Sequence, residues 1–272
     1  MKQLSDYTLI SDIDGTLLPS DGIIPQRNIE AIRRFAAQGG KFGVATGRSL
    51  RFTVEQIKHL PINIPCIICN GSAIYDMQAD QILMELPLPD TAKAYTREIL
   101  EEMPHIGVVM MRNDGDETMQ SEEDFIKQVI TWETLPLHQS KIDVITGSFY
   151  KLIFYVQPKD KEAFLAYLNK KNYPDVRFVA SHHTLIEMLP CQSRKGFALE
   201  KMIDMGMTTR ENLVAVGDYY NDLEMILLAG TGATLCDAPD DLKGIADLVV
   251  GTCEQGAIAD VVEYLERLCG QT

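Results

Sequence analysis

Two aspartates near the start of the chain, Asp12 and Asp14, have the type and spacing to do chemistry together. They end a short apolar run, and because strand residues alternate between faces, both side chains project to the same side. Gly15 allows the sharp turn that must follow. Such a pair can place a nucleophile beside a proton donor, or it can bind a cation. A calcium loop is the alternative, but Thr16 and Leu17 break the EF-hand pattern of oxygen ligands.

Further polar residues follow apolar runs later in the chain: Thr46-Gly47-Arg48, Asn70-Gly71-Ser72, Gly217-Asp218 and Asn221-Asp222. Ligands of a parallel sheet bind beyond the carboxyl ends of its strands, so we expect these groups to meet at one place. Lys195, at the start of a helical pattern, can join them. Converging acidic groups repel one another unless a hard divalent cation lies among them, and oxygen ligands of this type suit Mg²⁺.

The elements that must position these residues alternate between short apolar runs and helical stretches. Helical spacing marks Pro25 to Gln38 and the segment after Lys195-Gly196. Alternation of this kind predicts an α/β fold with a Rossmann-like parallel sheet core and helices on both faces. The expected strands are Thr8 to Ile13, Phe42 to Ala45, Cys66 to Cys69, Leu213 to Val216, Ala233 to Cys236 and Leu248 to Val250.

The middle of the chain has a different pattern, which indicates an inserted α+β domain. Prolines interrupt the chain at Pro87, Pro89 and Pro190. We therefore assign residues 1-84 and 190-272 to the core and residues 85-189 to the insertion. Its expected parts are helices at 90–103 and 159–171, strands at 106–111, 150–157, 176–181 and 184–189, a charged stretch at 121–140 and a His182-His183 turn.

Composition argues against several classes of partner. The formal net charge of −14 and the pI near 4.8 are unfavourable for binding nucleic acid or an anionic membrane surface. No run approaches the roughly 18 apolar residues of a membrane span, and no signal-type segment opens the chain. The six scattered cysteines are typical of reduced thiols. We expect a cytoplasmic protein, and the sequence leaves its oligomeric state open.

The motifs in their order carry a resemblance to a known family. They are Asp12-Ile13-Asp14-Gly15-Thr16-Leu17, Thr46-Gly47-Arg48, Lys195-Gly196, and Gly217-Asp218 with Asn221-Asp222. With an insertion between the second and third motifs, the chain resembles the haloacid dehalogenase superfamily of phosphatases, in its Cof-like branch with a C2-type (IIB) cap. Asn70-Gly71 is similar to the third-strand Asn-Gly of that branch.

The resemblance implies a role for each catalytic residue. Asp12 would attack the phosphorus and form an aspartyl-phosphate. Asp14 would protonate the leaving alcohol and later accept a proton from the attacking water. Thr46 would hydrogen-bond a phosphoryl oxygen, and Lys195 would neutralise charge on the phosphate and the nucleophile.

The resemblance also implies a metal site. Mg²⁺ would be held by the Asp12 carboxylate, the Asp14 backbone carbonyl and Asp218, while Asp222 would bind it directly or support the other ligands. The remaining residues expected around phosphate or substrate are Gly47, Arg48, Asn70, Gly71 and Asn221.

Some of these roles have structural alternatives. Thr46 can merely cap the following helix, and Asn70 can be a turn residue. Arg48 can bind substrate or form a structural ion pair. The local sequence leaves these alternatives open.

The expected function is hydrolysis of a small phosphorylated metabolite, such as a sugar phosphate, with Mg²⁺ as cofactor. The cap would close over the site and exclude water. A phosphotransferase or phosphomutase would use the same intermediate and is one alternative. A non-catalytic phosphometabolite-binding protein is another, although a pure binder has no use for a second carboxylate beside Asp12.

Overall fold

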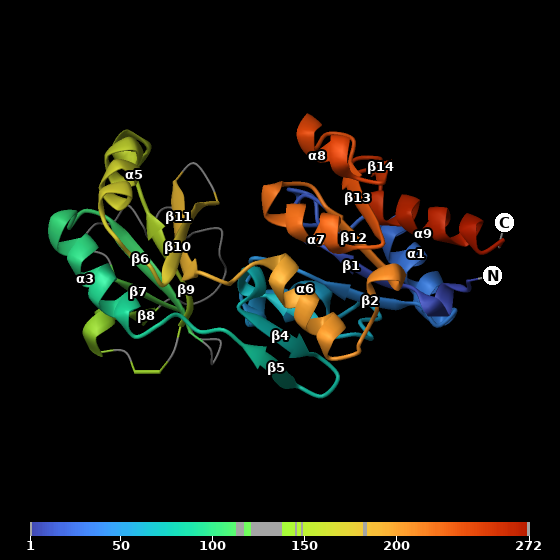
Figure 1. Ribbon diagram of the computed structural model, residues 1–272, viewed down its shortest axis with the longest axis horizontal. Helices are drawn as coiled ribbons and strands as arrows, with labels where there is room; N and C mark the ends of the chain where they lie inside the picture. Colours follow the sequence, from blue (N-terminus) through green and yellow to red (C-terminus); the bar gives the residue numbers. More distant parts are fainter. Residues whose placement is uncertain are drawn as a thin grey trace. The chain divides into compact units, whose positions relative to one another are not determined.

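The chain folds into two compact units (Figure 1). One consists of Met1–Glu85 with Arg194–Thr272, and the other of Leu86–Ser193. The sequence prediction put these boundaries at 84/85 and 189/190. The computed structural model describes residues 2–112, 117–120, 138–144, 146–147, 149–181 and 184–270.

A five-stranded parallel sheet forms the centre of the first unit, in the order β14-β13-β12-β1-β2. From β1 the chain continues to β2 on one side, whereas β12, β13 and β14 follow one another on the other side. This change of direction puts a topological switch point between β1 and β12. The strands are β1 (Thr8–Ser11), β2 (Lys41–Val44), β12 (Leu213–Gly217), β13 (Thr231–Leu235) and β14 (Leu248–Val250).

Helices cover both faces of this sheet because its strands are apolar on both sides. Leu9 packs into a core with α1 and α9, which lie side by side in Figure 1, whereas the next residue, Ile10, packs into a core with α6 and α7. The predicted Rossmann-like core is therefore confirmed. These helices are α1 (Gln26–Ala37), α6 (Lys195–Asp204), α7 (Leu223–Leu228) and α9 (Ala257–Leu268).

A small antiparallel sheet, β3-β4-β5, adjoins β2 through a parallel bridge between Ala45 and Ile67. The sequence predicted β3 but not the β4–β5 hairpin. The elements are β3 (Cys66–Ile68), β4 (Ala73–Asp76), β5 (Gln81–Glu85), α2 (Leu50–Ile57), α8 (Asp240–Ile245), and the 3₁₀ helices η1 (Leu4–Asp6), η2 (Cys69–Gly71), η6 (Arg210–Asn212) and η7 (Tyr220–Asp222).

The second unit is an α+β insertion with its own core, as predicted. Its sheet has the order β10-β11-β9-β6-β7-β8, and α3 and α5 pack on one face around residues such as Phe154 and Phe164. Most of the stretch at 121–140 and the His182-His183 turn lie outside the described residues. The elements are α3 (Thr91–Glu102), β6 (Gly107–Arg112), β7 (Glu117–Gln120), β8 (His138–Gln139), η4 (Ile142–Val144), β9 (Phe149–Tyr155), η5 (Pro158–Asp160), α5 (Lys161–Lys170), β10 (Val176–Ala180) and β11 (Leu185–Pro190).

Among the described helices of both units, none combines the length and the apolarity that crossing a membrane requires.

Candidate active site

The two strands beside the switch point bring two acidic residues together. Asp12 directly follows β1 and Asp218 directly follows β12. The backbone N–H of Asp12 donates to the Val216 carbonyl at 2.9 Å, which extends the pairing of these strands beyond the end of β1. The carboxylates therefore meet because their strands are neighbours in the sheet, although they lie far apart in the sequence.

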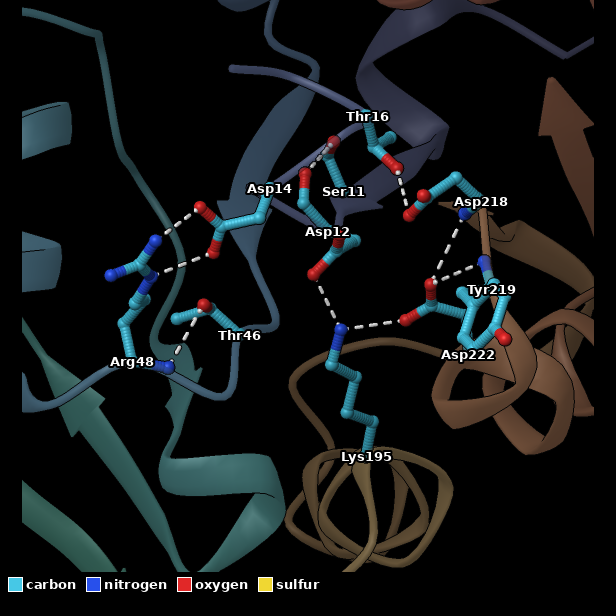
Figure 2. A network of polar contacts seen from close by, with 10 residues as sticks. All are labelled: Ser11, Asp12, Asp14, Thr16, Thr46, Arg48, Lys195, Asp218, Tyr219 and Asp222. Carbon is cyan, nitrogen blue, oxygen red and sulfur yellow. Dashed lines mark hydrogen bonds and ion pairs between the residues drawn. The ribbon is translucent and has the colours of Figure 1, made fainter. Parts of the chain in front are cut away.

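Lys195 is a buried cation at the centre of the site. It is the first residue of α6, and its side chain is only 1% exposed. Its Nζ donates to Oδ1 of Asp12 at 2.5 Å and to Oδ1 of Asp222 at 2.6 Å (Figure 2). Burial opposes the charge on Lys195, but these two carboxylates outweigh burial and raise the pKa of the lysine. Lys195 thus makes two buried ion pairs, one with Asp12 and one with Asp222.

The site has more carboxylates than positively charged groups. Burial raises the pKa of Asp12 well above its usual value, and Asp222 and Asp218 add to the rise while Lys195 opposes it. Burial, with Asp222 next, also raises the pKa of Asp218 to about 6. Oxygen atoms of Asp12, Asp218 and Asp222 lie within 4.8 Å of one another. Crowded hard oxygen ligands of this kind suit a divalent cation such as Mg²⁺.

Asp222 has partners for both of its carboxylate oxygens. Oδ1 accepts from Lys195, and Oδ2 accepts from the backbone N–H groups of Asp218 at 3.1 Å and Tyr219 at 3.3 Å. A Cβ on Gly217 would lie 2.3 Å from Asp222, so glycine is needed for this close approach. These contacts hold the Asp222 carboxylate beside Asp218, and its part in metal binding, direct or supporting, stays a prediction.

Asp14 is paired with Arg48. Nε and Nη2 of Arg48 donate to Oδ2 and Oδ1 of Asp14, each at 2.9 Å (Figure 2). The guanidinium lies over the ring of Phe52, 4.2 Å from its centroid. Of the two alternatives that the sequence left open for Arg48, the structure contains the ion pair.

Thr46 lies just past β2 and has a hydroxyl that accepts from the backbone N–H of Arg48 at 3.1 Å. Its backbone carbonyl accepts from the N–H of Asn70 at 2.9 Å. Asn70 has the left-handed φ of 57°, and a Cβ on Gly47 would come within 2.9 Å of its side-chain oxygen. Asn70 and Gly47 thus pack the two loops together, while phosphate contact by either residue stays a prediction.

Gly71 links this region to Lys195. Its φ is +95°, and a Cβ there would lie 2.2 Å from the carbonyl oxygen of Arg194, the residue before Lys195. The observed role of Gly71 is close packing against the start of α6. Asn221 is exposed on η7, and its substrate contact remains a prediction.

Sequence reasoning assigned no role to several residues that hold the site together. The hydroxyl of Thr16 donates to Oδ1 of Asp218 at 3.1 Å, and Ser11 donates to the backbone carbonyl of Asp12 at 2.6 Å. Gly15, which the sequence assigned only to the sharp turn, also passes so close to Asp218 that a Cβ would lie 2.6 Å from Oδ2. A hydroxyl residue beside an acidic motif was a usable signal for Thr16, but its partner lies 202 positions away.

Comparison with known proteins identifies the family. A family model described as haloacid dehalogenase-like hydrolase matches residues 9–262, which span parts of both units and contain every candidate site residue. The chain belongs to the haloacid dehalogenase-like hydrolase family. The resemblance drawn from its motifs is therefore confirmed.

Curated relatives of this hydrolase are named as phosphatases. Pyridoxal phosphate phosphatase YbhA of Escherichia coli (strain K12) is 27% identical over 266 residues, covering 92% of this chain and 95% of the relative. The 5-amino-6-(5-phospho-D-ribitylamino)uracil phosphatase YwtE of Bacillus subtilis (strain 168) is 28% identical over 283 residues, covering 96% and 97%. These names confirm the predicted enzyme class, a phosphatase of this hydrolase family.

A solved structure supports the fold. A haloacid dehalogenase-like hydrolase from Bacteroides thetaiotaomicron aligns with a TM-score of 0.86 at 21% identity, covering 95% of this chain and 99% of that chain. The α/β fold predicted from the sequence, with its insertion, is therefore shared with the solved Bacteroides structure.

Proposed function

We propose that this hydrolase is a Mg²⁺-dependent phosphatase of a small phosphorylated metabolite and that it acts through an aspartyl-phosphate on Asp12. The observation that carries the proposal is the buried Asp12–Lys195 contact of 2.5 Å beside Asp218. A nucleophile of this type needs a fixed cation, since attack on a phosphate ester brings anions together. The names of the two relatives describe phosphatases of small phosphorylated compounds, which fits this class of substrate.

The carboxylate cluster fits the proposed Mg²⁺, which prefers hard oxygen ligands. Asp12, Asp218 and the backbone carbonyl of Asp14 would hold the ion, with Asp222 in support. When bound, Mg²⁺ would supply positive charge to phosphoryl oxygens. We also propose that Leu86–Ser193 is a C2-type cap, which selects the leaving group.

The side chains around Asp12 divide the work of phosphoryl transfer. A carboxylate oxygen of Asp12 attacks the phosphorus, the bond to the leaving oxygen breaks, and a covalent aspartyl-phosphate forms. Lys195 offsets the negative charge that accumulates. The hydroxyl oxygen of Thr46 accepts a hydrogen bond from the backbone N–H of Arg48. Among the described residues, none accepts the hydrogen of this hydroxyl. The Thr46 O–H can therefore donate to a phosphoryl oxygen.

Asp14 moves the proton in both halves of the reaction. It protonates the leaving alcohol as the aspartyl-phosphate forms. In the second half it accepts a proton from the water that attacks the phosphorus, which releases phosphate and restores Asp12. The two aspartates thus have separate roles, since a single carboxylate cannot carry the phosphoryl group and the proton together.

The test is phosphate release from a panel of phosphorylated metabolites, with Mg²⁺ and with the ion removed by chelation. We expect release only with Mg²⁺. Phosphoryl transfer to an added sugar without free phosphate would indicate a phosphotransferase or phosphomutase instead. Tight binding of a panel member without turnover would indicate a binding protein.

A further inference from the structure

We propose that Arg48, supported by Phe52, is a positioning residue for the proton donor Asp14. The inference rests on the proposed function, because Asp14 acts as an acid and base only in that reaction. Of the two alternatives that the sequence left open for Arg48, substrate contact and a structural ion pair, it takes the ion pair and gives it a role exerted through another side chain.

The Asp14 carboxylate needs an external support. Its side chain is 44% exposed, so little packing restricts its rotamer. Within the described part of the chain, Arg48 is the residue that hydrogen-bonds it, through two parallel contacts of 2.9 Å. A bidentate guanidinium fixes both oxygens and their plane, which a single donor cannot do.

Arg48 is itself held from two sides. Phe52, on the first turns of α2, lies under the guanidinium with its ring centroid 4.2 Å away. The backbone N–H of Arg48 donates to the Thr46 hydroxyl at 3.1 Å. The proposed proton donor is therefore tied to the loop that carries the proposed phosphoryl ligand, and the two groups keep their spacing.

This support can release Asp14 when a proton must move. The Arg48 side chain is 28% exposed, and ion pairs open to solvent contribute little free energy, so the pair opens easily. Placement still matters for the rate, because a shift of about 1 Å at a reacting group can cost on the order of 10²-fold.

The experiment compares two substrates of the full-length Mg²⁺-loaded enzyme: 4-nitrophenyl phosphate, whose leaving group needs no proton, and an alkyl phosphate. For Arg48→Met we expect kcat on the alkyl phosphate to fall about tenfold, part of the 10²–10⁴-fold that general acid–base catalysis supplies. On 4-nitrophenyl phosphate the fall should be under about threefold, and both KM values should stay within about twofold. Asp14→Asn should show the same selectivity in stronger form.

Two milder variants keep the test independent of folding defects. Arg48→Lys retains the positive charge but loses the two parallel donors of the guanidinium. Phe52→Leu removes the aromatic ring beneath the guanidinium. Both should reduce kcat on the alkyl phosphate selectively, by less than Arg48→Met, with an unchanged thermal unfolding temperature.

The outcomes separate the two proposals. Equal losses of kcat on both substrates, or a loss confined to KM, would refute the positioning role while leaving the phosphatase intact. If the unmodified enzyme with Mg²⁺ releases no phosphate from either substrate or from any member of the metabolite panel, the proposed function falls, and the role of Arg48 falls with it.

Discussion

At the scale of single residues, the site depends on one buried ammonium among several carboxylates. Lys195 contacts Asp12 and Asp222, and the three side chains are nearly inaccessible to water. Removing charges from water is costly, and a buried ion left without its partner is more costly than the intact pair. We therefore expect Lys195 to matter for the stability of the core unit as well as for the proposed chemistry.

Lys195→Met should lower the free energy of unfolding by about 3–5 kcal/mol, because it leaves buried carboxylates without their cation. Urea denaturation of the metal-free protein measures the change. Lys201→Met is the matched control, since Lys201 lies on the same helix in an exposed pair with Asp204. Lys201→Met should lower the free energy of unfolding by less than about 1 kcal/mol. Equal losses for the two variants would show that the buried ion pairs stabilise the protein no more than the exposed pair does.

Asp12→Asn should abolish Mg²⁺-dependent phosphate release while leaving the fold intact, because an amide is a poor nucleophile and Asn has nearly the same shape. Phosphate release and far-ultraviolet circular dichroism measure the two effects. Substantial residual turnover by a folded variant would exclude the covalent mechanism on Asp12.

At the scale of elements, the start of α6 is set by a backbone contact with η2. Gly71 lies against the carbonyl of Arg194 so closely that any side chain would displace one of the two segments. Because Lys195 is the next residue, such a displacement would also move its ammonium relative to Asp12. The position of the Lys195 side chain thus depends on Gly71, which lies more than 120 residues earlier in the chain.

Gly71→Ala should cost about 2–5 kcal/mol of unfolding free energy, the sum of a left-handed φ and an overpacked contact. Gly206→Ala is the control: its φ is +74°, but among the described residues no atom lies within 4 Å of an added Cβ. It should cost only about 1–2 kcal/mol. Chemical denaturation and phosphate release compare the two, and activity should fall only for Gly71→Ala. Similar costs would mean that the Arg194 contact adapts without penalty.

At the scale of the whole molecule, the two units have separate hydrophobic cores. The core of Leu86–Ser193 includes Phe154 and Phe164, whereas the candidate site lies entirely in the other unit. Separate cores make separate unfolding transitions possible. A ligand that binds only one unit should therefore stabilise only that unit.

Calorimetry should resolve two unfolding transitions, of which Mg²⁺ raises only one. At a concentration of 100 times its Kd, the ion should add about 2.7 kcal/mol to the unit that binds it. Asp218→Asn should abolish this shift. Phe154→Ala, which should cost about 3–5 kcal/mol, should lower only the other transition. A Mg²⁺ shift that persists in Asp218→Asn would place the ion elsewhere.

The sequence by itself determined the parallel sheet, the insertion and the sheet edge at which the motif residues converge. Apolar runs and helical spacing are local patterns, and parallel strands all end at the same edge, so the polar residues that follow them must converge. The sequence did not predict the β4–β5 hairpin, because Gln81–Glu85 is only partly buried and its apolar and polar residues alternate weakly. Its signal was too faint to separate from a loop.

Only the tertiary structure decided which partner each side chain takes. Lys195 and Asp12 are 183 positions apart, and nothing in the local sequence states that Lys195 bridges Asp12 and Asp222. The same holds for Arg48, which pairs with Asp14, and for Gly71, which packs on Arg194. Such pairings depend on the paths of loops and on side-chain rotamers, and these are fixed by packing between segments that lie far apart in the sequence. The two aspartates of the first motif therefore acquire different partners, Lys195 for Asp12 and Arg48 for Asp14, from the fold alone.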